Sequence, residues 1–274
     1  MKLLSHAEFY TIPARVLGIM SVFQIKITRD KGEVVAAQRL RFEVFHLEVK
    51  KGMGSSLQQG LDVDDYDPIC EHLIVRSSKD RRVVGTYRLL LGSEARKHAG
   101  FYSEREFDLE NIKMLRGELL ELGRSCVHRD YRDRAVIDFM WQAIADYVRR
   151  HHVRYLFGCA SLHTTHHREV NEFYALVREG YYAPEEIRVS PLPDKSFPSL
   201  NGTIEIQDPQ ALFLQLPGLI KGYLRIGALL CGPPALDLEF GTADFFLLLD
   251  IKEMTSNYRR RFGFSGPKVR DAVA

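Results

Sequence analysis

The strongest constraint in this chain is a strand, a helix and a second strand in direct succession. Residues 118–127 (ELLELGRSCV) predict a strand, and Gly123 in its middle indicates a β-bulge. Apolar residues then recur at helical spacing over 136–148, and Asp133 can cap this helix. The apolar run 155–160 predicts a buried strand. This order requires a parallel strand pair and predicts a mixed α/β fold, that is, an α+β arrangement around a mixed sheet.

The preceding residues predict antiparallel partners for that unit. Residues 23–28 alternate apolar and polar side chains, as a strand does, and helical spacing follows over 30–48 with Asp30 as a cap. Residues 71–76 and 82–91 predict a hairpin. We therefore expect the sheet to be mostly antiparallel, with one parallel pair.

A change of composition separates a C-terminal part from this core. Residues 182–201 are rich in proline and polar residues and predict a long connecting segment. After it we expect an apolar helix in 216–230 and a strand in 244–251. The domains predicted in this way are an N-terminal segment 1–21, a core 22–182, an extension 183–262 that packs on the core, and a mobile tail 263–274.

Charge and cysteine content exclude several classes of protein. The 38 basic and 36 acidic residues leave a formal net charge of +2, which argues against a nucleic-acid binder. Four cysteines without a CxxC pair indicate reduced thiols in a cytoplasmic protein. No window approaches the roughly 20 apolar residues that span a bilayer. Peripheral contact with the inner membrane surface through 216–230 stays possible, and packing of that helix into the core is the alternative.

Charged residues also stand where the pattern is otherwise apolar. Arg41 lies one helical turn before Phe45, and is either a site residue or a surface arginine whose stem covers the core. Asp64 and Asp67 lie in an acidic loop, which is either a ligand site or a solvated turn. Glu121 shares a strand with Arg124, and a charge buried there needs a partner, so a structural ion pair is the alternative to a catalytic role.

Other reactive residues match no regular motif. His163, His166 and His167 follow Cys159, but their spacing fits none of the regular zinc motifs. The acidic loop lacks the glycine and the terminal glutamate of an EF-hand. Cys126 has no histidine that the pattern nominates as its base. We therefore expect neither a bound metal nor a cysteine nucleophile.

Nine segments carry a resemblance when they are taken in order. They are RLRFEVF (39–45), DDYD (64–67), EHLIV (71–75), VVGTYRLL (83–90), GFYSEREFDL (100–109), ELGRSCVHRDYR (121–132), YLFGCAS (155–161), LPGLIKGYLRIGA (216–228) and TADFFLLLD (242–250). Together they resemble the L-ornithine Nα-acyltransferases, which make lyso-ornithine lipid from 3-hydroxyacyl carrier protein and ornithine. That family is similar to the acyl-homoserine lactone synthases and to the GNAT acetyltransferase fold. The resemblance covers roughly 22–262, with 22–182 as the GNAT-like core.

The resemblance also implies roles for individual residues. The RxxxF, DxxD and ExxR motifs of the autoinducer synthases, with their hairpin arginine, form a charged network beside the acyl-transfer site. It implies that Glu121 is the base, directly or through water, that Arg124 and Arg88 hold the acceptor carboxylate, and that Asp64 or Asp67 binds the side-chain ammonium. The implied substrate-binding residues are Arg41, Phe45, Asp64, Asp67, Arg88 and Ser125.

One departure from the wider fold bears on the acyl donor. Enzymes of the GNAT fold that use coenzyme A hold its pyrophosphate on a Q/RxxGxG/A turn, and both glycine positions are occupied here, by Ala135 and Ile137. A phosphopantetheine arm on acyl carrier protein fits this better, with no resident cofactor. Arg129, Arg132 and Arg134 would suit an acidic carrier protein, or would serve helix capping and solubility.

Two other functions remain open at this stage. The acceptor could be glycine, glutamine, lysine or another amine instead of ornithine. Alternatively, the chain could be a non-catalytic module that binds acyl carrier protein or lipid. A lactone-signal synthase is disfavoured, because the residues after Phe45 (HLEVKKG) lack the tryptophan that those enzymes usually have there.

Overall fold

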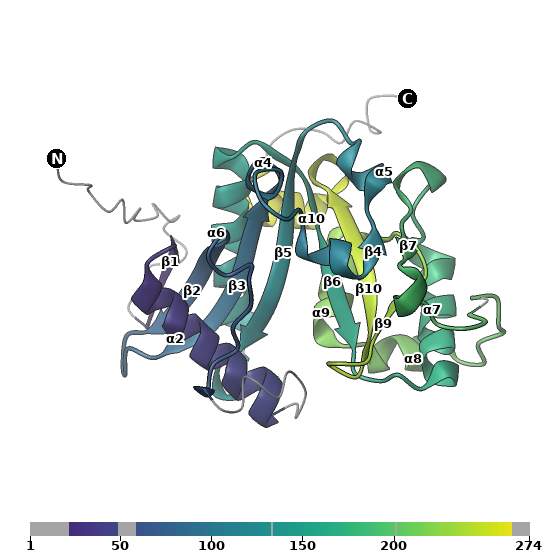
Figure 1. Cartoon of the computed structure of the whole chain (residues 1–274), viewed down its shortest axis with the longest axis horizontal. Coiled ribbons are helices and arrows are strands. Elements are labelled where there is room, and N and C mark those ends of the chain that lie inside the picture. Colours follow the sequence, from purple (N-terminus) through teal and green to yellow (C-terminus); the bar gives the residue numbers. More distant parts are fainter. Residues whose placement is uncertain (1–21, 49–58, 133, 201, 265–274) are drawn as a thin grey trace.

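The computed structural model describes residues 22–48, 59–132, 134–200 and 202–264. Figure 1 shows a central twisted sheet with helices on both sides. The predicted segment 1–21, the capping residue Asp133 and residues 265–274 of the predicted tail lie outside the described residues.

A single large sheet organises the chain and confirms the mixed α/β class. Its strands follow the order β1-β2-β3-β5-β6-β10-β8, and β9 pairs with β10. Every pairing in it is antiparallel except β5 with β6. The strands are β1 (Phe23–Thr28), β2 (Glu71–Ser77), β3 (Val83–Leu91), β5 (Glu118–Val127), β6 (Val153–Leu162), β8 (Leu229–Leu230), β9 (Ala235–Asp237) and β10 (Thr242–Asp250). A small second sheet pairs β4 (Phe107–Asp108) with β7 (Ser190–Pro191).

The parallel pair separates along its length, and this opens the sheet. Strands β5 and β6 pair only from Glu118 with Val153 to Glu121 with Phe157. The two strands still approach closely at Gly158. A Cβ atom added to Gly158 would lie only 2.3 Å from the Leu122 carbonyl oxygen. The remaining residues of the two strands do not pair with each other. An opening through the sheet therefore begins just beyond Leu122.

Helices cover the two faces of the sheet. Asp30 caps the N-terminus of helix α2 (Lys31–Phe42), because its side chain accepts a hydrogen bond from the Glu33 N–H. The helix continues as a π-helical turn, Glu43–Glu48. The predicted helix after β5 is α6 (Arg134–Arg150), and α7 (His167–Tyr181) is a helix that we did not predict. The other helices are α4 (Gly92–Ala95), η3 (Tyr102–Arg105), α5 (Glu110–Lys113), η4 (Arg129–Tyr131), η5 (Glu185–Ile187), η6 (Pro193–Lys195), α8 (Pro209–Gln215), α9 (Gly218–Ile226), η7 (Ile251–Glu253) and α10 (Ser256–Arg261).

Two apolar layers lie on opposite faces of the sheet. The larger packs α6, α7 and α9 against one face and includes Leu122, Val136 and Phe245. The second packs η3, β4 and α5 against the other face and includes Leu90, Phe107 and Phe246. Because side chains alternate along a strand, neighbouring residues such as Phe245 and Phe246 enter different layers. The opening between β5 and β6 joins the two faces.

The predicted C-terminal helix belongs to the core. In α9, Ile220 and Leu224 are buried in the larger layer, while Leu219 on the opposite side is exposed. The apolar face of α9 therefore packs in the core. Such packing was the alternative to membrane contact. No helix within the described ranges is both long and apolar enough to cross a bilayer.

Candidate active site

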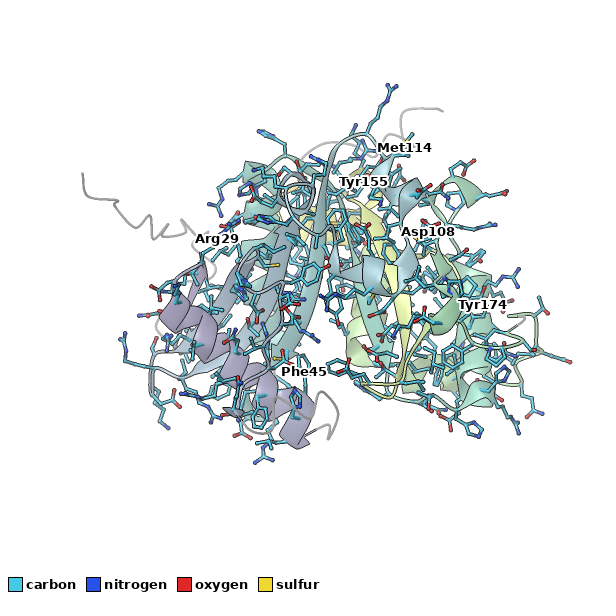
Figure 2. All side chains as sticks on the ribbon, viewed as in Figure 1. Arg29, Phe45, Asp108, Met114, Tyr155 and Tyr174 are labelled. Carbon is cyan, nitrogen blue, oxygen red and sulfur yellow. The ribbon has the colours of Figure 1, made fainter. Side chains whose placement is uncertain are left out.

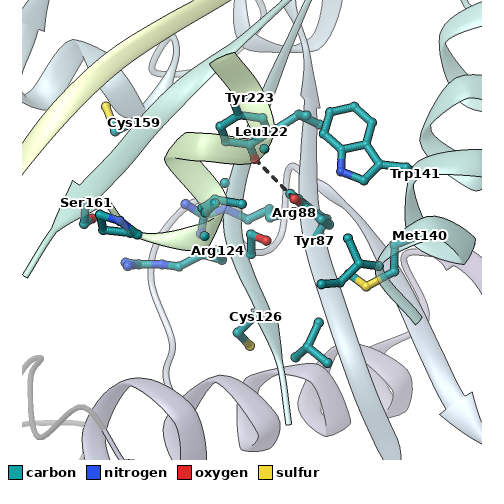
Figure 3. Close-up of a pocket in the computed structure, with 18 of the residues that line it drawn as sticks. Tyr87, Arg88, Leu122, Arg124, Cys126, Met140, Trp141, Cys159, Ser161 and Tyr223 are labelled. Atoms are coloured by element: carbon teal, nitrogen blue, oxygen red, sulfur yellow. Dashed lines mark hydrogen bonds between the residues drawn. The ribbon is translucent and has the colours of Figure 1, made fainter. Parts of the chain in front are cut away.

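A cavity of about 790 Å³ occupies the opening between β5 and β6. Figure 3 shows that aromatic and aliphatic side chains form one part of its wall, while Arg124 and Ser161 lie on another. The apolar lining includes Tyr87, Leu122, Met140, Trp141, Leu219 and Tyr223. The polar lining includes Arg88, Ser103, Glu106, Glu121, Arg124, Ser161, Asp237, Thr242 and Asp244.

The two linings come from the two faces of the sheet. Tyr87 and Leu122 belong to the larger apolar layer, beneath α6. Their neighbours Arg88 and Glu121 point to the opposite face, since side chains alternate along a strand. The cavity therefore crosses the sheet and places an apolar compartment against a charged one.

Arg41 is buried but is not among the residues that line the cavity, and Asp64 and Asp67 do not line it either. Its side chain is about 1% exposed and binds Asp67 through two hydrogen bonds of 2.8 Å, from Nη1 to Oδ1 and from Nη2 to Oδ2. Its Nε donates to Asp62 Oδ1, also at 2.8 Å. Arg41 is thus no surface residue. It ties helix α2 to the acidic loop and fixes the loop beside the cavity.

Asp64 joins the same network from the loop to the sheet. Arg88 donates to Asp64 Oδ1 at 2.5 Å, and Arg124 donates to Asp64 Oδ2 at 3.0 Å. Burial alone would raise the pKa of Asp64, but the two guanidinium groups outweigh it and hold the pKa well below its usual value. Asp64 and Asp67 are therefore ionised and already paired, which leaves them poorly suited to the ammonium-binding role that the resemblance implied.

The predicted bulge in β5 is present, and it directly follows Gly123, at Arg124. Between the pairs Arg88–Gly123 and Thr86–Cys126, β5 has one residue more than β3. Arg124 there adopts a φ of +47°, a conformation that side chains other than glycine rarely take. Strained backbone of this kind persists only where its surroundings enforce it. The bulge turns the Arg124 side chain into the cavity.

Two aromatic rings hold the Arg124 guanidinium in place. Its Cζ lies 5.1 Å from the centroid of Tyr102 and 5.2 Å from that of Phe240. Its buried Nε has no hydrogen-bond partner among the described residues. Asp62 Oδ1 lies 3.6 Å from this Nε, which is an ion-pair distance. Arg124 is thus oriented and keeps a donor for an anionic group.

Glu121 is buried and fully engaged by the turn that begins η3. Its Oε2 accepts from the Tyr102 N–H at 2.8 Å, and its Oε1 accepts from the Ser103 N–H at 2.8 Å and the Ser103 hydroxyl at 2.5 Å. Burial raises the pKa of Glu121, and these hydrogen bonds oppose the increase. The Ser103 hydroxyl also lines the cavity and accepts a contact of 3.3 Å from the Cys159 thiol.

The remaining residues of the implied substrate set line the cavity but differ in exposure. Phe45, labelled in Figure 2 and part of the turn Glu43–Glu48, and Ser125 are partly buried parts of its wall. Cys126, beside Ser125, is buried, and burial raises the pKa of its thiol to about 12. A thiol that stays protonated at neutral pH is a poor nucleophile, in keeping with our expectation.

Of the three arginines assigned to the carrier protein, Arg132 is the one that lines the cavity among the described side chains. Arg132 lines the cavity and binds Glu48 through two hydrogen bonds of 2.6 and 2.8 Å. Arg129 is exposed and pairs with Asp130. Arg134 is the first residue of α6, but its side chain lies outside the described atoms.

Sequence reasoning missed three buried carboxylates in the cavity. Glu106 follows η3, Asp237 ends β9, and Asp244 lies in β10. One oxygen from each lies within 4.8 Å of the others. Burial raises the pKa of Glu106 well above its ordinary value, and Asp244 and Asp237 add to the increase. Burial likewise raises the pKa of Asp244 to about 6. An aspartate near the start of the otherwise apolar run DFFLLLD was the signal available for Asp244.

Comparisons with known proteins show what this chain is similar to. A family model described as an acetyltransferase (GNAT) domain matches residues 40–142. An L-ornithine N(alpha)-acyltransferase from Brucella abortus (strain 2308) is 35% identical over 260 residues, which cover 91% of this chain and 92% of that protein. A protein of the same name from Rhodobacter capsulatus is 36% identical over 245 residues, covering 86% of this chain and 93% of that protein. The solved structure of FeeM, an N-acyl amino acid synthase from uncultured soil microbes, covers 89% of this chain and 98% of its own, with 11% identity and a TM-score of 0.47.

Proposed function

The chain belongs to the family of the L-ornithine N(alpha)-acyltransferases, and from that premise we propose how its cavity transfers a fatty acyl group to the α-amine of ornithine. The observation that carries the proposal is the 35% identity to such an enzyme over more than nine-tenths of both chains. The cavity supports it, because an apolar compartment suits an acyl chain and a charged one suits an amino acid.

The acceptor carboxylate would bind Arg124. This guanidinium is held by Tyr102 and Phe240, its Nε is unpartnered, and its side chain is 12% exposed, against 3% for Arg88. Hydrogen bonds between an arginine and a carboxylate are strong and directional. Arg88 would act on the carboxylate mainly through its charge, since Asp64 already occupies its Nη1 atom.

The proton of the α-ammonium would leave through Ser103 to Glu121. The amine must lose this proton because an ammonium group has no lone pair. The Ser103 hydroxyl can accept a proton while passing its own to Glu121 Oε1, 2.5 Å away. Burial favours the protonated carboxyl that results. Glu121 therefore keeps the role implied by the resemblance, with a hydroxyl in place of a water molecule.

Acyl transfer would then follow without a covalent enzyme intermediate. The neutral amine attacks the thioester carbonyl carbon, and the carbonyl oxygen becomes an oxyanion. Backbone N–H groups near Gly123 and Ser125, at the bulge, are our candidates to stabilise it. The oxyanion then collapses and the C–S bond breaks. The attacking nitrogen, positively charged after the attack, releases one proton and the sulfur takes one up, so the products are the amide and the thiol of phosphopantetheine.

The acyl donor in this proposal is a carrier-protein thioester, and no resident cofactor is required. The helix N-terminus at α6 has Ala135 and Ile137 where a pyrophosphate-binding turn has glycine. Arg132 at the cavity rim and the exposed Arg129 supply positive charge for an acidic carrier protein. We place the reaction in the cytoplasm, with the lipid product passing to the inner membrane surface.

Product analysis tests the proposal. The purified protein is incubated with a long-chain 3-hydroxyacyl carrier protein and a mixture of amino acids, and the products are read by mass spectrometry. We expect N-acylated ornithine, and none when acyl-coenzyme A replaces the carrier protein. Acylation of glycine, glutamine or lysine instead would keep the reaction and correct the acceptor. No acylated amine from an active donor would favour a non-catalytic binding module.

A further inference from the structure

The three buried carboxylates form the second charged feature of the cavity, and the proposed reaction leaves them without a role. Glu106 is 5% exposed, Asp237 8% and Asp244 4%. After burial, the largest influences on the pKa of Glu106 are Asp244 and Asp237, which raise it, and no cation is among the main causes. Carboxylates this close and this buried repel one another unless a cation or shared protons intervene.

Buried polar atoms without hydrogen-bond partners indicate that the three carboxylates bind a ligand. Glu106 Oε2 and Asp244 Oδ1 are buried and, within the described part of the chain, make no hydrogen bond. The hydroxyl of Thr242, a residue 3% exposed, is equally unpartnered. Thr242 and Asp244 are two residues apart on β10 and thus share a face, and both line the cavity. Buried polar atoms without partners are rare, and they call for a ligand, an ion or a water molecule.

The position of the three carboxylates relative to Arg124 indicates what kind of ligand fits. Asp237 accepts hydrogen bonds from the N–H groups of Glu239 at 2.8 Å and Phe240 at 3.1 Å. The ring of the same Phe240 packs against the Arg124 guanidinium. One residue therefore contacts both charged features, and the cavity offers a cationic and an anionic contact at neighbouring positions. An α-amino acid with a second, terminal amine has matching charges.

We propose that Glu106, Asp237 and Asp244, with the Thr242 hydroxyl, bind the side-chain ammonium of the acceptor and so select a diamino acid. This inference rests on the proposed acyl transfer to ornithine and deepens it. A terminal ammonium has three N–H donors, and the unpartnered atoms Glu106 Oε2, Asp244 Oδ1 and Thr242 Oγ1 are acceptors. The cation also removes the repulsion among the carboxylates.

Selection between two acceptors tests this inference. Norvaline is ornithine without the terminal amine, so it keeps every contact except the proposed one. We expect Asp244→Asn and Glu106→Gln to lower kcat/KM for ornithine by at least about tenfold, the order expected when a hydrogen bond to a charged group is lost. The value for norvaline should stay unchanged or rise. Asp250→Asn is the matched control, because Asp250 lies on the same strand but pairs with Arg154 away from the cavity.

Three results would overturn the inference. An equal loss with both acceptors would assign the carboxylates to proton transfer or to folding. An unchanged ratio of ornithine to norvaline in both variants would show that the ammonium binds elsewhere. Loss of wild-type activity in EDTA, with recovery on adding Mg²⁺ or Mn²⁺, would assign them to a metal ion.

Failure of the parent proposal has a different signature. In that case wild-type protein would acylate neither amino acid, although the donor is active. The inference would then be judged by binding alone: ornithine should raise the melting temperature of wild-type protein, and of Asp250→Asn, more than norvaline does. Loss of this difference in Asp244→Asn would support the ammonium subsite. Its absence in wild-type protein would overturn it.

Discussion

Two clusters of buried charge face one cavity, and they differ in how their charges are satisfied. In the first cluster, the aspartates of the 62–67 loop pair with Arg41, Arg88 and Arg124. Arg41 alone makes four hydrogen bonds to Asp62 and Asp67. In the second, the carboxylates of Glu106, Asp237 and Asp244 have one another as neighbours. In the first cluster the aspartates are paired without a ligand, and Arg124 keeps its Nε without a hydrogen-bond partner among the described residues. In the second cluster the carboxylates themselves include oxygens without such a partner, and these are available to a ligand.

The clusters should therefore respond in opposite ways when a charge is removed. Taking one charge from a complete network leaves its partner buried and uncompensated, which destabilises the fold. Taking one charge from a group of like charges removes a repulsion, which stabilises it. Five predictions follow from this contrast and from the residues that connect the two clusters.

The largest effect is expected at Arg41. Arg41→Met should lower the free energy of unfolding by about 3–5 kcal/mol, because Asp67 and Asp62 lose their buried partner. Urea denaturation measures this. Arg82→Met is the control: its pair with Glu43 is partly exposed, and the expected loss is below about 1 kcal/mol. Equal losses in the two variants would mean that the first cluster is not what holds the loop.

A second prediction concerns Ser103, which lies between Glu121 and the cavity. Ser103→Ala should lower kcat about 100-fold, the lower end of what positioned proton transfer contributes, with little change in the KM for ornithine. Glu121→Gln should lower kcat at least as much. It should also lower stability, since an amide nitrogen would face N–H donors of Tyr102 or Ser103. Near-normal turnover in Glu121→Gln would remove it as the final proton acceptor.

Arg124 belongs to the first cluster and, in the proposed reaction, also binds the acceptor carboxylate. Its replacement should therefore affect substrate binding more than folding. Arg124→Gln should lower kcat/KM for ornithine about 10- to 100-fold, since hydrogen bonds between charged groups contribute about 1.5–3 kcal/mol. The effect should appear mainly in the KM for ornithine, with the KM for the acyl donor as the internal control. A change confined to the donor would place the carboxylate elsewhere.

In the second cluster, removal of a charge should raise the free energy of unfolding instead of lowering it. The pKa of Asp244 is raised from 3.8 to about 6 in the folded protein, so the folded state binds more protons than the unfolded state between these values. This group therefore lowers stability as pH rises from about 4 to about 6. Asp244→Asn should remove that loss and raise the free energy of unfolding at pH 7 by about 3 kcal/mol at most.

Denaturation at pH 4 and at pH 7 tests the sign. The stabilising effect should be full at pH 7 and much smaller at pH 4, where Asp244 is protonated in the folded state and partly protonated in the unfolded state. Asp250→Asn provides the comparison on the same strand, because it breaks a pair with Arg154 and should destabilise. Destabilisation by Asp244→Asn at pH 7 would show that the second cluster is satisfied in a way that resembles the first.

The two clusters also differ in how far the sequence anticipated them. Arg41, Asp64, Asp67 and Arg88 lie in motifs that a resemblance could recognise, and the structure does bring them together. The motifs did not reveal that these charges satisfy one another, because hydrogen bonding depends on tertiary geometry. Gly123 likewise indicated the bulge, but the left-handed residue is Arg124, held by the aromatic rings around it.

The second cluster depends on contacts between segments that no local pattern connects. Glu106, Asp237 and Asp244 come from three separate elements, and each looks like an ordinary polar residue in its own stretch of sequence. Most strands and the α6 helix were predictable, since their apolar periodicity is local. Helix α7 was not predicted, although its residues Val170, Phe173 and Val177 keep helical spacing after the histidines at its start.

The smallest effect is expected where charge is exposed, at the rim assigned to the carrier protein. Arg129 is 72% exposed and pairs only with its neighbour Asp130, so Arg129→Glu should leave the fold intact. If the rim attracts an acidic carrier, the KM for the acyl donor should rise a few-fold at low salt, and the difference should shrink in about 0.5 M NaCl. Arg168→Glu is the matched control, because Arg168 is also highly exposed, at 83%, but lies on α7, away in sequence from the lining residue Arg132. Equal behaviour of the two variants at every salt concentration would mean that exposed charge at this rim does not recruit the donor, and recognition of the carrier would then have to rest on the buried cavity itself.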